Sequence, residues 1–164
     1  MTARRDRYSV IVGSLVVALL LTIVPLPAWL AAVWPYWVAL VMIYWCLETQ
    51  GLITLGLAFA FGLIVDLFTG SLLGLHALSL VIIVYLVTRF RARLRFFPPW
   101  QLAVSVLALL LNDRIILLWI ISLRGDPIPS LLFWLSPLAG MLLWPWLFLM
   151  LDRLRGAMRH RRLR

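Results

Sequence analysis

Few side chains in this sequence could perform chemistry, and all of them lie within or beside long apolar segments. They are Asp66, His76 and the consecutive residues Asn112, Asp113 and Arg114. One histidine and two aspartates are fewer ligands than a catalytic metal site normally uses. No nucleophile stands at a recognisable spacing from a base. We therefore expect no catalytic residue, metal or cofactor, and interpret these groups as candidates for binding a partner or a ligand.

The rest of the chain is too apolar for a soluble protein. Its 164 residues are 65% hydrophobic and 13% charged, whereas soluble domains are about 45–50% apolar and about 25% charged. A domain of roughly 150 residues buries only about 70% of the surface that its unfolded chain exposes. We therefore predict an all-α integral membrane protein. At about 20 residues per span, the chain has room for at most six or seven spans and for no separate extramembrane domain.

Six apolar segments can be separated by polar, glycine or proline breaks. The stretch 34–68 has only Glu48 and Asp66 as formal charges, and as one helix it would be about 52 Å long. The hydrocarbon core is about 30 Å thick, so we divide this stretch at Glu48-Thr49-Gln50-Gly51, which has turn chemistry. The predicted domain covers 1–164, with transmembrane helices at 8–24, 34–48, 51–67, 72–88, 100–123 and 130–151.

The basic residues predict the orientation of these spans. All fifteen are arginine and give a net charge of +9, but they lie between apolar runs rather than on a soluble face, which argues against nucleic-acid binding. With six spans, thirteen fall on one side: those before position 8, then Arg89, Arg91, Arg93 and Arg95, and those of the tail 152–164, including Arg153 and Arg155. Since positively charged loops stay inside, we predict that both termini are cytoplasmic.

The arginine clusters also have a predicted role at the membrane surface. We interpret residues 89–95 as a basic interfacial loop, and the tail 152–164 as an amphipathic or disordered segment. Both would anchor the protein to membrane lipids, because each arginine near an anionic leaflet contributes about 1 kcal/mol. Docking of the tail onto an acidic cytoplasmic protein is the alternative.

The candidate polar residues are all expected in the outer half of the bilayer, where they could form one cluster. Asp113 and Arg114 are adjacent on a helix and point about 100° apart, so they cannot pair face to face. We expect Arg114 to pair with Asp66 on a neighbouring helix, which would neutralise both charges. These groups could cap helix ends or form an interhelical pair that fixes the register of the bundle. They could also form a ligand or transport site or dock a partner, because polar groups within the membrane are functional candidates by default.

Small and aromatic residues within the spans indicate where helices pack. The pairs Ala58/Gly62 and Ser136/Gly140 lie within predicted helices and would let backbones approach closely. Three tryptophans are expected to lie deep in the membrane and to pack between helices: Trp119, Trp144 and Trp146.

One motif in the centre of the chain is more specific than the span count. It is D-x-x-x-G-x-x-x-G-x-H-A-L, matched by Asp66, Gly70, Gly74, His76, Ala77 and Leu78. It lies within GLAFAFGLIVDLFTGSLLGLHALSLVIIVYL, downstream of YWVALVMIYWCLETQG and upstream of RFRARLRFFPPWQLAV. In these stretches, and over nearly its whole length, the chain resembles the MreD family of rod shape-determining membrane proteins.

This resemblance implies a non-enzymatic component of the bacterial cell-elongation machinery in the cytoplasmic (inner) membrane. Members of the family associate with the bitopic protein MreC. They also associate with MreB, with the glycosyltransferase RodA and with its class B penicillin-binding partner, in lateral peptidoglycan synthesis. The resemblance therefore implies a role in maintaining cell shape, with MreC as the direct partner.

At fold level the family is also similar to the substrate-binding subunits of energy-coupling-factor transporters, which have six helices and an outward-facing ligand site. That analogy would place a cavity near Asp66, His76 and Asp113. Fold alone does not determine function. A small-molecule or lipid-binding membrane subunit of a transporter therefore stays the alternative interpretation.

Overall fold

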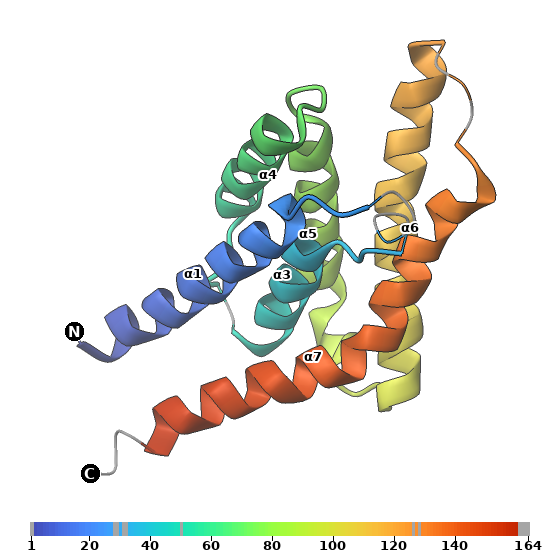
Figure 1. Cartoon of the computed structure of the whole chain (residues 1–164). Coiled ribbons are helices and arrows are strands. Elements are labelled where there is room, and N and C mark those ends of the chain that lie inside the picture. The colour runs from blue at the N-terminus through green and yellow to red at the C-terminus, as the bar shows by residue number, and fades with distance from the viewer. Residues whose placement is uncertain are drawn as a thin grey trace.

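The structure is a computed structural model that describes residues 2–27, 30, 33–49, 51–125, 127 and 129–160, with only the backbone described for 2–7 and 157–160. Figure 1 shows a bundle of α-helices. The elements are α1 (Thr2–Ile23), α3 (Trp37–Glu48), α4 (Leu55–Thr69), α5 (Leu75–Leu94), α6 (Pro99–Leu123), the 3-10 helix η1 (Leu131–Trp134) and α7 (Leu135–His160). Gln50 and the tail arginines at 161, 162 and 164 lie outside the described residues.

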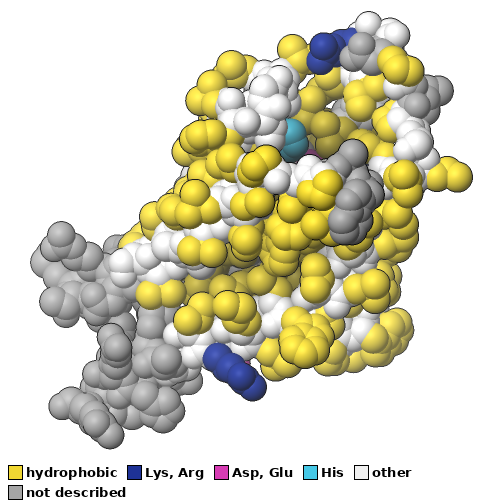
Figure 2. Space-filling model, viewed as in Figure 1, with side chains coloured by type: hydrophobic (Ala, Val, Ile, Leu, Met, Phe, Trp, Pro, Cys, Tyr) yellow, Lys and Arg dark blue, Asp and Glu magenta, His cyan; other side chains and the backbone are white. Residues whose placement is uncertain are grey.

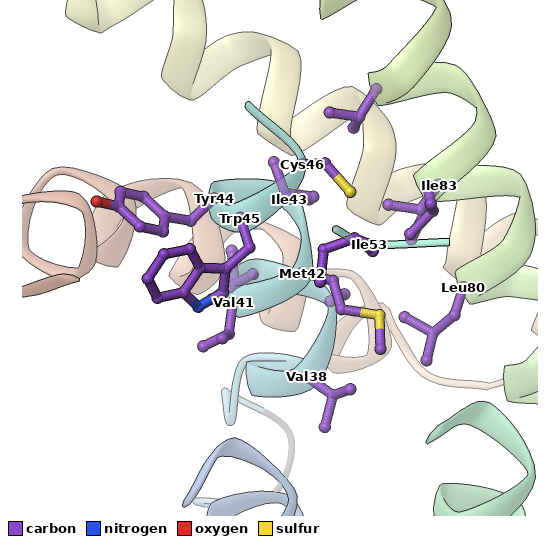
Figure 3. Packing of buried hydrophobic residues seen from close by; sticks show 14 of the residues in the cluster. Val38, Val41, Met42, Ile43, Tyr44, Trp45, Cys46, Ile53, Leu80 and Ile83 are labelled. Carbon is purple, nitrogen blue, oxygen red and sulfur yellow. The ribbon is translucent and has the colours of Figure 1, made fainter. Parts of the chain in front are cut away.

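The short helix α3 forms the centre of the bundle. Every residue from Val38 to Leu47 is buried, and α3 contacts α1, α5, α6 and α7. Figure 3 shows side chains of α3, such as Met42, packed with Leu80 and Ile83 of α5. A helix that is apolar on all sides must be covered on all sides. The surrounding helices provide this cover for α3.

The lengths of the helices can be compared with the six predicted membrane spans. Among the described residues, three segments are long and apolar enough to cross a membrane: Leu75–Leu94, Pro99–Leu123 and Leu131–Gly156. The other apolar helices are shorter, and α3, with 12 residues, is only about 18 Å long. The predicted all-helical class with six α-helices is therefore confirmed over the described residues, while three helices combine spanning length with sufficient apolar character among those residues.

The predicted helix boundaries at the three arginine clusters are wrong. Helix α1 begins at Thr2 rather than at residue 8, so the first cluster is helical. Helix α5 continues beyond residue 88 to Leu94, so three of the arginines expected in a loop are helical. No glycine or proline interrupts this helix, and it ends just before Pro98-Pro99. Pro99 then occupies the first turn of α6, where its fixed backbone angle suits a helix start. Helix α7 likewise extends to His160, into the predicted tail.

Two of the arginines predicted to anchor the protein to the membrane also contact the C-terminal end of α3. Arg91 Nε donates to the carbonyl oxygen of Leu47 at 2.9 Å, and Arg155 forms an ion pair with Glu48. The last carbonyls of a helix have no partner within it, and positive charge there complements the helix dipole. The C-terminal parts of α3, α5 and α7 therefore meet at one end of the bundle.

The small-residue pairs bring helices together within the chain. Gly62 and Ala58 are both buried on α4, and a Cβ atom added to Gly62 would lie 2.2 Å from the Cα atom of Ala77 on α5. A Cβ atom on Gly140 of α7 would lie 2.4 Å from a methyl carbon of Leu110 on α6. The predicted close contacts therefore exist, and they are internal.

Of the three tryptophans expected between helices, Trp144 is buried and lies beside Phe148, with a ring-centroid distance of 6.1 Å. The prediction was wrong for Trp119 and Trp146, which are 72% and 79% exposed. Indole rings suit the membrane interface or a partner surface because one edge is polar. These two side chains therefore face the surroundings of the bundle.

The glycine contacts predict graded effects of adding one methyl group. Gly62→Ala should lower the free energy of unfolding by about 2–3 kcal/mol, because overpacking against backbone cannot be relieved by a rotamer change. Gly140→Ala should cost less, since the Leu110 side chain can move. Gly13→Ala is the control, because no atom lies within 4 Å of the added Cβ. Unfolding in detergent would measure the three, and equal effects at positions 62 and 13 would contradict the packing.

Candidate functional site

Asp66 is the most completely coordinated polar side chain in the bundle. It lies in the last turn of α4 and is only 1% exposed. Its Oδ1 accepts hydrogen bonds from the Ser71 hydroxyl at 2.7 Å and the His76 backbone N–H at 2.9 Å, and pairs with His76 Nδ1 at 2.8 Å. Its Oδ2 accepts from the backbone N–H of Gly74 at 2.8 Å. We call Asp66, Ser71, Gly74 and His76 the Asp66 clasp.

The clasp explains the spacing of the central motif. Gly74 and His76 contribute two of the first N–H groups of α5, which have no acceptor within the helix. A carboxylate satisfies them and complements the positive end of the helix dipole. The chain reverses between α4 and α5 through Gly70 at φ +65° and Gly74 at φ +99°, backbone conformations that glycine adopts without strain. The motif therefore encodes a turn and the acid that closes it.

The predicted ion pair between Asp66 and Arg114 is wrong. Asp66 is satisfied by groups within ten residues of it in the sequence, as described above. Arg114 Nη2 instead donates to Ser136 Oγ at 2.7 Å, and its guanidinium lies 4.7 Å from the centre of the Phe133 ring. The prediction failed because it considered only formal charges, whereas helix N–H groups and an imidazole stabilise this carboxylate.

Arg114 belongs to a second polar network, which connects three parts of the chain. Ser136, on α7, accepts from Arg114 and donates to the carbonyl oxygen of Trp34 at 2.8 Å. The indole Nε1 of Trp34 donates to the carbonyl oxygen of Leu21 on α1 at 2.8 Å. This network fixes the segment that precedes α3 against α1, α6 and α7.

A third contact links α5 with α6. The Ser79 hydroxyl donates to Asp113 Oδ1 at 2.5 Å, and both residues are buried. Asn112, the neighbour of Asp113, does not join this cluster: its side-chain nitrogen is buried without a hydrogen-bond partner among the described residues. Of the three consecutive polar residues on α6, only Asp113 and Arg114 have polar partners in the structure.

These networks surround a cavity of about 200 Å³. Its walls come from the end of α1 and the segment after it, from residues 34–36, and from His76, Asp113 and Arg114. The phenol of Tyr36 also lines it; this residue is 8% exposed, and its hydroxyl has no hydrogen-bond partner among the described residues. The Tyr36 and His76 rings meet edge to face, 5.5 Å between centroids. Figure 2 shows an imidazole at a hollow in a largely apolar face.

The structure thus brings several predicted site residues to one end of the bundle. His76, Asp113 and Arg114 line the cavity, while Asp66 and Gly74 lie behind His76 in the clasp. Sequence reasoning gave no site role to the side chains that complete these networks: Tyr36, Ser71, Ser79 and Ser136. Hydroxyl groups within apolar helices form interhelical hydrogen bonds, so the serines were the available signal.

Comparisons with known proteins agree on one family. A family model described as rod shape-determining protein MreD matches residues 4–154. The rod shape-determining protein MreD of Haemophilus influenzae is 32% identical over 149 residues, which cover 88% of this chain and 90% of the relative. No solved structure matches the chain. The likeness to energy-coupling-factor subunits therefore stays a prediction.

The clasp predicts which polar residues are energetically coupled. Asp66→Ala should lower the free energy of unfolding by about 3 kcal/mol or more, since it leaves buried donors without an acceptor. In double-mutant cycles, Asp66→Ala should couple to His76→Ala by about 1 kcal/mol or more and to Arg114→Ala by less than about 0.5 kcal/mol. Thermal unfolding of the purified variants would measure both. Stronger coupling to Arg114 than to His76 would restore the rejected ion pair.

Proposed function

Because the chain belongs to the MreD family of rod shape-determining proteins, we propose that it is a non-enzymatic membrane component of the bacterial cell-elongation complex. In this role it binds MreC directly and helps maintain rod shape and lateral peptidoglycan synthesis, in one complex with MreB, RodA and a class B penicillin-binding protein. The observation that carries the proposal is the family match, which includes the Asp66 clasp and most of every described helix.

The distribution of side chains supports a role in binding within the membrane. The connections between helices are short, because α4 and α5 are joined by residues 70–74 and α5 and α6 by residues 95–98. Gly62 and Gly140 are used for close helix contact inside the bundle, whereas Gly13 on α1 and Gly56 on α4 are exposed. Large apolar side chains are also exposed on four different helices: Leu20, Phe59, Trp119 and Trp146. A bitopic partner could therefore pack its helix against these large side chains or across the exposed glycines, mainly by van der Waals contact.

We further propose that the protein lies in the inner membrane with both termini cytoplasmic. Figure 2 shows a broad apolar band with arginine side chains visible only near its upper and lower edges. Most arginines of the sequence fall on one side in the six-span arrangement, in agreement with the positive-inside rule. In this arrangement the short helix α3 passes through the centre of the bundle rather than through lipid.

The alternative function, a small-molecule or lipid-binding subunit of a transporter, has one supporting observation. This is the cavity lined by His76, Asp113 and Arg114. The family match favours the elongation complex as the place where the protein acts. A ligand in the cavity and MreC on the outer surface would use different parts of the molecule, so the two binding activities can be tested separately.

Site-specific photo-crosslinking would test direct contact with MreC. A photoreactive residue at each exposed apolar position, 20, 59, 119 and 146, should crosslink to co-expressed MreC on one helix face, and on that face only. Position 144 is the control, because Trp144 is buried. Crosslinking at none of these exposed positions, together with failure of MreC to co-purify, would contradict the proposed direct binding.

Cysteine labelling would test the proposed topology. The native Cys46 is buried, so replacing it with alanine gives a background without reactive thiols. In that background, a membrane-impermeant maleimide added to intact cells with a permeable outer membrane should label Pro127→Cys but not Ala92→Cys. Both positions are exposed, and permeabilising the inner membrane should make Ala92→Cys reactive as well. The reverse pattern in intact cells would invalidate the six-span topology.

A further inference from the structure

The cavity is lined by hydrogen-bond donors and by a carboxylate oxygen that have no hydrogen-bond partner among the described residues. Arg114 uses one guanidinium nitrogen for Ser136, and its other N–H groups have no hydrogen-bond partner among the described residues. The Tyr36 hydroxyl is buried without a hydrogen-bond partner in the described part of the chain. Asp113 uses Oδ1 for Ser79, while no described group donates to its Oδ2. Buried polar groups without partners are rare in native structures, so the Tyr36 hydroxyl indicates a ligand site, and the free atoms of Arg114 and Asp113 line the same cavity.

The two formal charges of the cavity restrict the chemistry of that ligand. Asp113 and Arg114 both line the wall, yet neither forms an ion pair within the described residues. A simple anion would be attracted by Arg114 and repelled by Asp113. A simple cation would be attracted by Asp113 and repelled by Arg114. Like-charge contacts select against wrong ligands, and opposite charges favour correct ones. A molecule that carries both a negative and a positive group can pair with Arg114 and Asp113 at the same time.

The size and rigidity of the cavity restrict the ligand further. Its volume is about 200 Å³, whereas a cavity of about 150 Å³ is large enough for benzene. The ligand is therefore a small molecule or a headgroup. Trp34 is fixed on both sides, through its indole to Leu21 and through its carbonyl to Ser136. The same serine holds Arg114, so the cavity walls and the charged group are positioned before any ligand arrives, which lowers the entropic cost of binding.

We propose that this cavity binds a small zwitterion, whose phosphate or carboxylate contacts Arg114 and Tyr36 and whose ammonium contacts Asp113. Two sources offer this chemistry: the ethanolamine headgroup of a membrane phospholipid and a free amino phosphate or amino acid. The binding role goes beyond the elongation-complex function, because it concerns a ligand site that MreC binding does not require.

Tyr36→Phe is the sharpest variant for this proposal, since it removes one hydroxyl and leaves the ring in place. Because no described residue forms a hydrogen bond with that hydroxyl, the ligand-free variant should melt at the same temperature as the parent or higher. Its affinity for the zwitterion should fall about tenfold, the usual effect of losing a hydrogen bond to a charged group. Tyr44→Phe is the matched control: it lies on α3 about 12 Å further along and does not line the cavity.

The experiment uses the full chain purified in detergent. Native mass spectrometry with equal amounts of phosphatidylethanolamine and phosphatidylglycerol tests the lipid source, because the second lipid keeps the phosphate and lacks the ammonium. Thermal shift with O-phosphoethanolamine, compared with glycerol 3-phosphate, tests the free source. The proposal expects about tenfold preference for the zwitterionic member of one pair. Asp113→Asn should abolish this preference, whereas Tyr36→Phe should weaken the binding of both members, because both carry the phosphate.

Each result has a defined meaning. Preference for phosphatidylethanolamine alone assigns the site to a lipid headgroup, and preference for O-phosphoethanolamine alone assigns it to a free zwitterion. No preference in either pair overturns the proposal. A preference that is unchanged in Asp113→Asn, together with an affinity that is unchanged in Tyr36→Phe, overturns it as well, because the ligand would then bind outside this cavity. Loss of MreC binding plays no part in these outcomes.

Discussion

A carboxylate within an apolar bundle is stable only when other groups in the protein satisfy its oxygens, and Asp66 meets this condition through the N-terminus of the next helix. The bonds to Gly74 and His76 close the turn between α4 and α5. That closure brings Gly62 against Ala77, so the two helices pack almost backbone to backbone. It also places the His76 ring in the cavity wall. Local hairpin, helix packing and cavity geometry therefore depend on one acidic group.

Apolar run length and residue type were sufficient to predict an all-helical chain. Of the residues expected in one polar cluster, His76, Asp113 and Arg114 line the same cavity, whereas the Asn112 side-chain nitrogen has no partner among the described residues. Pairing was harder to predict, because a sequence displays formal charges but not the N–H groups at helix ends. Asp66 was therefore assigned to Arg114, although its partners were ten or fewer residues away. The partner of Arg114 was a serine on α7, which a count of charges ignores. Helix ends failed for a related reason, since α5 continues through arginines whose long side chains suit a helix surface.

The short helix α3 shows how burial by protein can replace burial by lipid. A helix of about 18 Å leaves about 12 Å of a hydrocarbon core uncrossed, and backbone polar groups cannot be left bare in lipid. The neighbouring helices enclose α3 along its whole length. Its terminal carbonyls then need partners from within the protein, and Arg91 reaches one of them. The number of full-length apolar helices therefore underestimates how much of the chain lies within the bundle.

At both ends of the bundle, a charged side chain pairs with the partial charge of a helix terminus. The side chain is negative at a helix N-terminus and positive at a helix C-terminus. At the N-terminus of α5 an aspartate accepts from free N–H groups, and at the C-terminus of α3 an arginine donates to a free carbonyl. Both satisfy the partial charges that helix ends carry, and both connect different helices. Because these groups are engaged within the fold, we propose that recognition uses other parts of the surface: the large apolar side chains on the outside and the polar atoms of the cavity.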